Sequence, residues 1–288
     1  MLELPKQAQK MFVCKEEHLV IIAYSTARNL HVKFKKFKEY LPHNYSDFIE
    51  YCHPYEQMSI TCLFYWKYSD EESFVCLGVR ASNGVYHLII ASFEFPSYFK
   101  EITVFNFTSP ITKICEYSAG KIVLCEGKNL YMITLSLQNP RTLNILMKLS
   151  VRNKITSIAC DSSQSKIYIG DQKDGVIVVA VSPNSFSVLK NEVKGRAVCS
   201  IQNVGNFIVG GDLERNLFVL SENTVQNSLE GLLELTSVKL NDICYQIRRV
   251  ERRPNISFSS FSEYQVCVII GNLLMFCMEV LFVVASLL

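Results

Sequence analysis

The sequence predicts an all-β fold. Segments with similar patterns recur at spacings of roughly 40 to 45 residues, each begins with alternating apolar and polar residues, and continuous apolar runs follow. A period of two is the pattern of a half-buried strand, and a repeat of this length is that of one four-stranded propeller blade. We therefore expect a WD40-like β-propeller that is incomplete, with about five to six four-stranded blades.

The alternating segments are expected to be the first strands of the blades. In the second half of the chain and just before it they fall at residues 111–115, 155–159, 198–201 and 243–247. A second strand is expected after each of the first three, at residues 121–126, 166–171 and 206–212. These runs are almost wholly apolar, which is typical of strands that are buried on both faces.

The third strands open with Asn129, Gly175 or Asn216, residues that accept the positive φ angle of a tight turn. A more variable fourth strand is expected to close each unit, for example at residues 143–147 and 186–189. Four strands joined by turns, and repeated along the chain, make a series of propeller blades.

The N-terminal part follows the same pattern less regularly. Strands at residues 59–63, 74–78, 86–90 and 102–105 are expected to form one blade, and residues 10–14 and 19–22 to start another. Residues 30–57 are polar and interrupted by proline, so we expect an insertion loop there. The partial propeller is expected to span residues 1–278, and residues 279–288 are an apolar tail that can lie outside it.

The expected number of blades is below the roughly seven that commonly close such a ring. Open sheet edges recruit other strands. The chain is therefore expected to be a fragment or a subunit that other sequence completes.

The composition excludes several classes of protein. The 288 residues include 29 Lys and Arg and 27 Asp and Glu, so no overall basic charge attracts nucleic acid. The 11 cysteines stand singly in apolar runs, as buried free thiols do in a reducing compartment. All five histidines lie in the first third of the chain, away from most of the cysteines, so no metal site is expected. The N-terminus lacks the apolar core of a signal peptide, and secretion is not supported.

Two basic segments are candidates for contact with nucleic acid. They contain Lys33, Lys35, Lys36 and Lys38, and Arg248, Arg249, Arg252 and Arg253. Basic residues interleaved with aromatic rings, as in the first segment, can bind single-stranded nucleic acid by charge and stacking. Solvated loops are the alternative, and the polar composition favours them.

No catalytic constellation emerges from the sequence, and neither an enzyme nor a cofactor is expected. Asp171 and Asp212 end equivalent strands, and Asn216 opens the strand that follows Asp212. The repeated position predicts a structural role in the blade turns, with each carboxylate accepting hydrogen bonds from local backbone amides. Trp66, the only tryptophan, is expected either in the core or on a contact surface.

Residues 266–288 are almost wholly apolar, which is long enough for a helix that spans a bilayer. Glu279 would be costly near the middle of a membrane. The pair Gly271-Asn272 also suits a turn between two buried strands. We favour the strand pair, and a tail-anchored membrane protein with a cytosolic β domain stays as the alternative.

Two strand pairs resemble those of a known family. Residues 166–171 end in Gly170-Asp171, and Gly211-Asp212 is followed by Asn-Leu-Phe-Val at residues 216–219. This order of elements resembles the C-terminal propeller of the family that comprises the large cleavage and polyadenylation specificity subunit (CPSF-A), the large damage-specific DNA-binding subunit and the 130-kilodalton splicing factor 3b subunit. The resemblance covers roughly residues 11–276. Full members are several times longer, so the chain resembles a diverged or truncated member.

The resemblance implies a non-enzymatic scaffold in the nucleus that binds partner proteins in a nucleic-acid-processing complex. The complex would serve pre-mRNA splicing, 3′-end processing or the recruitment of a ubiquitin ligase to damaged DNA. The expected partners are protein subunits of that complex, and any contact with RNA or DNA is indirect or made through the local basic segments. The sequence leaves open which of the three branches applies.

Overall fold

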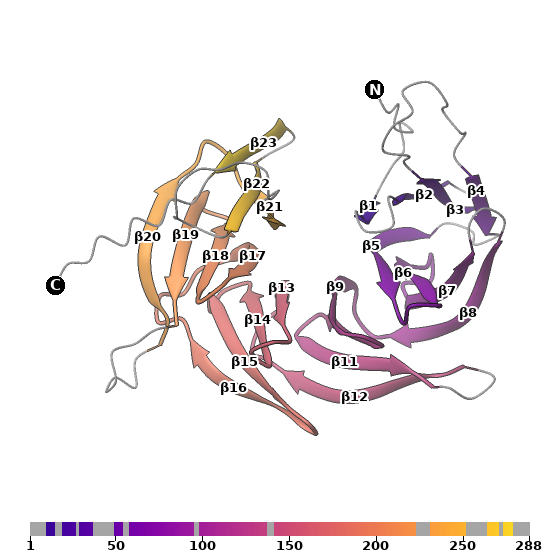
Figure 1. Cartoon of the computed structure of the whole chain (residues 1–288), viewed down its shortest axis with the longest axis horizontal. Helices are drawn as coiled ribbons and strands as arrows, with labels where there is room; N and C mark the ends of the chain where they lie inside the picture. Colours follow the sequence, from indigo (N-terminus) through magenta and orange to yellow (C-terminus); the bar gives the residue numbers. More distant parts are fainter. Residues whose placement is uncertain are drawn as a thin grey trace. The chain divides into compact units, whose positions relative to one another are not determined.

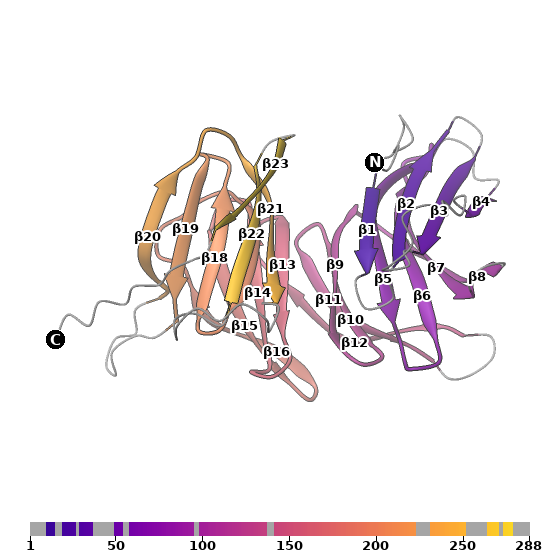
Figure 2. The same cartoon turned by 45° about the horizontal axis from the view of Figure 1, so that its top comes forward.

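The computed structural model of the chain describes residues 10–14, 19–26, 29–36, 49–53, 58–94, 98–136, 141–222, 231–251, 264–270 and 273–278. In these residues the strands form six antiparallel sheets, five of them four-stranded and one three-stranded. Within each sheet, neighbouring strands follow one another along the chain, so each sheet is a simple meander (Figures 1 and 2). The prediction of an all-β fold is confirmed, and the sheets have the form of propeller blades.

The chain divides into two compact units, residues 1–150 and residues 151–288. The first unit holds three of the sheets. Their strands are β1 (Lys10–Cys14), β2 (Leu19–Ser25), β3 (Leu30–Lys36) and β4 (Ile49–His53); β5 (Ser59–Lys67), β6 (Ser73–Arg80), β7 (Tyr86–Glu94) and β8 (Tyr98–Phe107); and β9 (Ile111–Ser118), β10 (Lys121–Glu126), β11 (Asn129–Leu135) and β12 (Leu143–Ser150).

The second unit holds the other three sheets. Their strands are β13 (Ile155–Asp161), β14 (Lys166–Asp171), β15 (Val176–Ser182) and β16 (Ser185–Asn191); β17 (Val198–Val204), β18 (Phe207–Asp212), β19 (Asn216–Ser221) and β20 (Leu233–Lys239); and β21 (Cys244–Glu251), β22 (Tyr264–Ile270) and β23 (Leu273–Met278).

The second strand of a blade is deeply buried, as its apolar sequence predicts. In β10 the side chains of Ile122, Val123, Leu124 and Cys125 are 0% exposed. The fourth strands β12, β16 and β20 are largely exposed, because each is the edge of its sheet. Burial therefore falls from the inner strands to the outer strand of the blade.

A β-bulge recurs in the first strand of five sheets, near its N-terminal end. In β13 the extra residue lies between Ile155 and Ser157, and in β17 between Val198 and Ser200. A bulge bends the strand and re-aims the side chains beside it. Here it accompanies the burial of two serines, because Ser157 and Ser200 are each 4% exposed.

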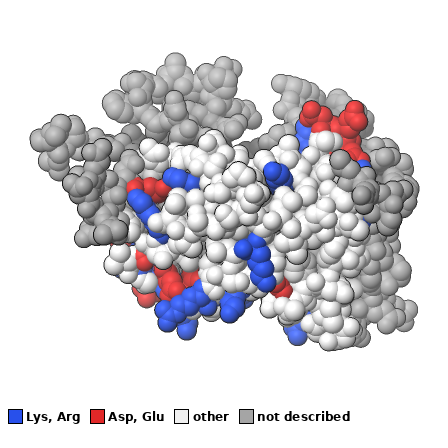
Figure 3. Space-filling view, turned by 90° about the horizontal axis from the view of Figure 1, so that it is seen from below, with Lys and Arg blue, Asp and Glu red and all other residues white. Residues whose placement is uncertain are grey.

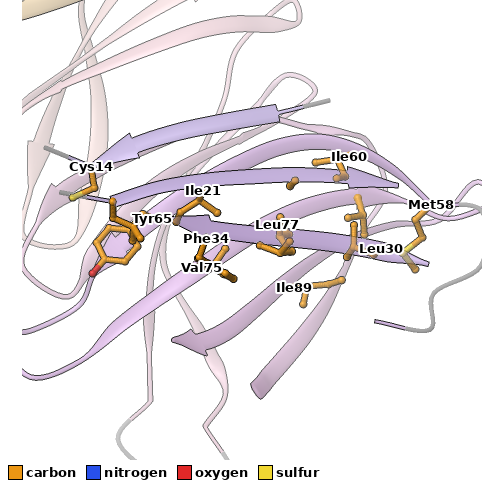
Figure 4. Close-up of a cluster of buried hydrophobic side chains, with 14 residues drawn as sticks. Cys14, Ile21, Leu30, Phe34, Met58, Ile60, Tyr65, Val75, Leu77 and Ile89 are labelled. Atoms are coloured by element: carbon orange, nitrogen blue, oxygen red, sulfur yellow. The ribbon is translucent and has the colours of Figure 1, made fainter. Parts of the chain in front are cut away.

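A hydrophobic cluster packs between the β1–β4 and β5–β8 sheets of the first unit (Figure 4). Ile21 and Phe34 from the first of these sheets lie against Val75, Leu77 and Ile89 from the second, and each of the five is 2% exposed or less. Burial of such side chains stabilises by about 1.5–3 kcal/mol each relative to leaving them exposed. This junction is held by apolar contact.

The expectation of an insertion loop at residues 30–57 is wrong for the two segments that form β3 and β4. Leu30, Val32 and Phe34 alternate along β3 and are buried, whereas Lys33 lies on the other face beside Tyr24, with its Nζ 5.5 Å from the centre of that ring. The lysines give this segment a polar composition, which suggested a loop. A strand with a period of two accommodates them, because long lysine side chains can extend along the sheet to solvent. Residues 37–48 and 54–57 lie outside the described residues.

In the apolar C-terminal run, residues 264–270 and 273–278 are the strands β22 and β23, not parts of one long helix. Their antiparallel pairing places Val266 opposite Met278, as the strand reading of this run expects. Residues 279–288 lie outside the described part of the chain. Over the described residues, the structure has no helix of the length and apolarity that crossing a membrane requires.

Candidate functional site

Asp171 is the last residue of β14 and is 0% exposed. Its Oδ1 accepts hydrogen bonds from the backbone N–H groups of Lys173 (2.8 Å) and Asp174 (2.9 Å) and from Nδ2 of Asn153 (3.1 Å). The turn ends at Gly175, whose φ of 81° is left-handed and favours glycine. The carboxylate is therefore bonded to the backbone of the turn that joins β14 to β15.

Asp212 occupies the corresponding position at the end of β18 and is 2% exposed. Its Oδ1 accepts a hydrogen bond from the backbone N–H of Asn216, and its Oδ2 accepts one from Nδ2 of the same residue, both at 2.8 Å. The turn between them contains Arg215 with a φ of 68°. The hydrogen bonds between Asp212 and Asn216 thus link the two ends of the turn from β18 to β19.

Glu126 is a third acid at this position, at the end of β10, and sequence reasoning did not single it out. Its Oε1 accepts hydrogen bonds from the hydroxyl (2.7 Å) and the backbone N–H (2.6 Å) of Thr108 and from the backbone N–H of Ser109 (3.0 Å). Its Oε2 accepts one from the hydroxyl of Tyr131 (2.9 Å). Burial by itself raises the pKa of Glu126, but these bonds outweigh burial and the net pKa is lowered. Burial and the bond to Glu126 raise the pKa of Tyr131 to about 12.

A buried arginine next to Asp212 is the second feature that the sequence did not reveal. The Arg196 side chain is 5% exposed, and its guanidinium pairs with Glu192 (2.5 Å) and with Glu234. Asp212 Oδ2 lies 3.9 Å from Nη1, and the guanidinium carbon lies 4.0 Å from the centre of the Phe218 ring. We call Glu192, Arg196, Asp212, Glu234 and Phe218 the arginine cluster.

The carboxylates of the arginine cluster differ in their electrostatics. Burial raises the pKa of Glu192, and this effect exceeds the opposing attraction of Arg196. For Glu234, burial also favours the neutral form, but the hydrogen bond from Arg196 and the charges of Arg196 and Lys194 outweigh it and lower the pKa. Ion pairs of this kind, between carboxylates and a buried guanidinium, are typical of a structural role. No side chain in the arginine cluster is placed to activate a nucleophile.

The arginine cluster ties two sheets together. Glu192, just after β16, accepts a hydrogen bond from the backbone N–H of Val176 in β15 (3.1 Å), and the backbone carbonyl of Arg196 accepts one from Gly175 (3.1 Å). Glu234 belongs to β20, and Phe218 to β19. The cluster therefore joins the β13–β16 sheet to the β17–β20 sheet.

The buried serines after the bulges bond to neighbouring sheets. Ser157 Oγ in β13 accepts a hydrogen bond from the backbone N–H of Ile201 in β17 (3.1 Å), and Ser200 Oγ in β17 accepts one from Ile247 in β21 (2.9 Å). The same device thus recurs at two successive junctions of the second unit.

The structure does not bring the predicted basic residues into a described cluster. Lys33, Lys35 and Lys36 are in β3, and Arg248 and Arg249 are in β21; of these five only the Lys33 side chain is described. Lys38, Arg252 and Arg253 lie outside the described residues. On the face in Figure 3, the described Lys and Arg side chains form small groups, several beside Asp and Glu, separated by wide uncharged areas.

Trp66 and several cysteines are core residues. Trp66 is 0% exposed and meets Tyr68 edge-on, with ring centres 5.2 Å apart. Burial raises the pKa of Cys62 and of Cys244 to about 12, and it raises the pKa of Cys76 and Cys125 as well. These thiols are protonated at neutral pH, so they are poor nucleophiles.

No curated protein matches the sequence. The family model of the CPSF A subunit region matches residues 77–274, which extend from β6 to β23 and include the arginine cluster and all three strand-end acids. The resemblance drawn from residues 166–171 and 206–220 is thereby confirmed. The chain belongs to the CPSF A subunit family.

Proposed function

We propose that the chain is a non-enzymatic nuclear scaffold subunit that binds partner proteins in a nucleic-acid-processing complex. The observation that carries this proposal is the match of residues 77–274 to the CPSF A subunit region. The proposed complex serves pre-mRNA splicing, 3′-end processing or the recruitment of a ubiquitin ligase to damaged DNA.

The construction of the blades supports a scaffold. Binding to a preorganised surface avoids the entropic cost of ordering that surface on association. The arginine cluster and the serine bonds join successive sheets through several directional contacts. Buried carboxylates fix the turns at Asp171 and Asp212, and the carboxylate of Glu126 fixes the segment at Thr108 and Ser109 that precedes β9. Rigid sheets of this kind can present loops to a partner in one conformation.

Affinity capture from nuclear extract with the full chain tests the proposal, with captured proteins identified by mass spectrometry. We expect subunits of one splicing, polyadenylation or cullin-ligase complex, and their identity names the branch. The matched control is the same chain unfolded and immobilised. Failure of the folded chain to enrich any such subunit over this control would contradict the scaffold.

Direct binding of nucleic acid is proposed only as a weak contribution of the basic segments. Replacing Lys33, Lys35, Lys36 and Lys38 with glutamine should lower any affinity for single-stranded RNA, and should flatten its dependence on salt, since each phosphate contact adds roughly 0.7 to the slope. A titration of labelled oligonucleotide at two salt concentrations measures both. Equal affinity and equal slope in the variant would assign the binding to another surface.

A further inference from the structure

Five connecting segments of the second unit lie side by side at one end of its sheets. They are residues 151–154, 172–175, 192–197, 213–215 and 239–243. Backbone hydrogen bonds join successive segments, with N–H donors and carbonyl acceptors in the pairs Gln172 to Lys154 (3.0 Å), Gly175 to Arg196 (3.1 Å), Leu213 to Ala197 (2.9 Å) and Leu240 to Arg215 (2.7 Å). We call these five segments the loop face.

Buried carboxylates hold the backbone of the loop face from beneath. Asp171, which is 0% exposed, accepts hydrogen bonds from the backbone N–H groups of Lys173 and Asp174. Asp212, which is 2% exposed, accepts one from the backbone N–H of Asn216, just after the segment 213–215. Because its backbone is fixed in this way, the loop face is preformed for binding.

Exposed basic side chains are in excess on the loop face. They are Arg152, Lys154, Lys173, Lys194, Arg215 and Lys239. The acids of the five segments that are not buried are Asp174, Glu214 and Asp242, so the surface has an excess of three positive charges. At the opposite end of the same sheets, the turns at residues 162–165, 183–184 and 205–206 contain no charged residue. The charge is therefore confined to one end of the sheets.

Four of these cations are free to pair with a ligand. The side chains of Arg152, Lys154, Lys173 and Lys239 have no hydrogen-bond or ion-pair partner among the described residues. Exposed apolar side chains accompany them, since Val193 is 81% exposed and Leu213 is 54% exposed. The loop face thus combines unpaired positive charge with apolar surface.

We propose that the loop face binds an acidic segment of a partner protein that carries leucine or another large apolar side chain among its carboxylates. The four free cations match the carboxylates, and Val193 and Leu213 match the apolar side chains. Complementary charge speeds association and selects the partner, and burial of apolar surface adds affinity. The proposal rests on the proposed scaffold function and names one of its binding sites.

The composition of the loop face favours a protein segment over a nucleic acid. Single-stranded nucleic acid is bound by cations that follow the phosphates and by aromatic rings that stack on the bases. The five segments contain no Phe, Tyr, Trp or His, and three exposed or half-buried acids lie among the cations. These acids repel a continuous row of phosphates, whereas a peptide can place its carboxylates beside the cations alone.

The test uses the purified full chain and fluorescein-labelled peptides, with binding measured by fluorescence anisotropy. The probe is Gly-Asp-Glu-Leu-Asp-Glu-Leu-Gly. One matched peptide has Asn and Gln in place of Asp and Glu, and another has Ala in place of Leu. We expect the probe to bind at least about tenfold more tightly than the amide peptide and about tenfold more tightly than the alanine peptide. Added salt should weaken the probe and leave the amide peptide nearly unchanged.

Two independent pairs of charge reversals test the cations. Lys154→Glu with Lys173→Glu, and Arg152→Glu with Lys239→Glu, should each weaken the probe by at least about fivefold, as expected for exposed ion pairs. Lys121→Glu with Lys148→Glu is the matched control, because these lysines are exposed in the first unit and the change in net charge is the same. All six side chains are exposed, and the second pair keeps the test decisive if the first fails to fold.

The apolar part of the loop face has its own variant. Val193→Asn with Leu213→Asn should weaken the probe by about tenfold and should abolish its advantage over the alanine peptide. Ile145→Asn with Leu146→Asn is the control, since both side chains are exposed on β12, at 55% and 43%. An unchanged affinity in the first variant would remove the apolar contribution.

Other results would overturn the proposal as a whole. Equal binding of the acidic and amide peptides, or equal loss in the control charge variant, would show that the loop face does not recognise carboxylates. Tighter binding of a labelled oligothymidylate, weakened by the same two charge variants, would assign the face to nucleic acid. The scaffold function is tested separately: nuclear capture that is identical for wild type and the Lys154→Glu, Lys173→Glu variant removes this site and leaves the scaffold in place.

Discussion

Two junctions between adjacent sheets are stabilised by different kinds of interaction. Between the β1–β4 and β5–β8 sheets, side chains such as Ile21 and Leu77 are 0% exposed, and none of the buried charged residues among the described ones belongs to these two sheets. Between the β13–β16 and β17–β20 sheets, an apolar core is supplemented by Arg196 and its carboxylates. Apolar contact is non-directional, whereas a buried ion cluster is favourable only as a complete set.

This difference determines how each junction should fail. Removal of one apolar side chain leaves a cavity that its neighbours partly fill. Removal of Arg196 leaves Glu192 and Asp212 buried without their cation, and no movement of apolar neighbours can compensate. The ionic junction should therefore tolerate substitution less well, and the following changes test that comparison from the largest effect to the smallest.

Arg196→Met should produce the largest loss, about 3–5 kcal/mol of local stability, because it leaves buried carboxylates uncompensated. Hydrogen exchange at the buried residues Ile201 and Val209 measures the free energy of opening of the β17–β20 sheet. Arg152→Met, at an exposed position of the same unit, is the matched control and should change it by less than about 0.5 kcal/mol. Equal effects of the two variants would show that the arginine cluster does not hold the junction.

Leu77→Ala should cost about 2–5 kcal/mol in the first unit, with the higher values if the cavity stays open. Urea unfolding followed by the fluorescence of Trp66 measures this, since Trp66 belongs to the same sheet. The loss should be independent of salt. Ile145→Ala, at an exposed side chain of the same unit, should leave the transition nearly unchanged, and a similar loss in that control would remove the distinction between core and surface.

Ser200→Ala should cost about 1–3 kcal/mol, because the buried N–H of Ile247 loses its acceptor. Faster hydrogen exchange of the Ile247 amide, with little change in β12, is the expected signature. Ser185→Ala on the exposed strand β16 is the control. An unchanged exchange rate at Ile247 would mean that the serine bond adds nothing to the junction.

Glu126→Gln should alter the dependence of stability on pH more than stability itself. The folded pKa of Glu126 is lowered from its ordinary value of 4.5, so its contribution is present above pH 4.5 and is lost as the pH falls through the lowered folded value. The variant should therefore lose less stability than wild type when the pH is taken below 4.5. Thermal unfolding of both proteins from pH 6 to pH 3 measures this, and parallel curves would contradict the assignment.

The sequence predicted most strands because their apolar pattern is local. The runs at 121–126 and 166–171 coincide with β10 and β14, since a second strand is covered on both faces and needs no polar residue. The strand β3 was missed because Lys33 and its neighbours make the segment polar, although Leu30, Val32 and Phe34 are buried. The strand β4 was missed because it lies in the same polar stretch, which proline interrupts. For the segment of β3, the alternation of apolar and polar residues predicts the strand better than the overall composition does.

The candidate sites were less predictable because they join distant segments. Asp171 and Asp212 could be recognised from their repeated place after Gly170 and Gly211, which is a local signal. Glu126 lacks that preceding glycine, and its donors Thr108 and Ser109 precede it by almost twenty residues. The arginine cluster draws on three separate segments, so only the sheet pairing brings its charges together.

Size-exclusion chromatography of the full chain after capture from nuclear extract tests the central claim, membership of a multi-protein assembly, most directly. The account predicts that the chain elutes far above its own mass of 32.9 kDa. It also predicts that identified subunits of one nucleic-acid-processing complex accompany the chain in a constant ratio across the peak. Elution of the folded chain alone at 32.9 kDa, with those subunits remaining in their own complexes, would contradict it.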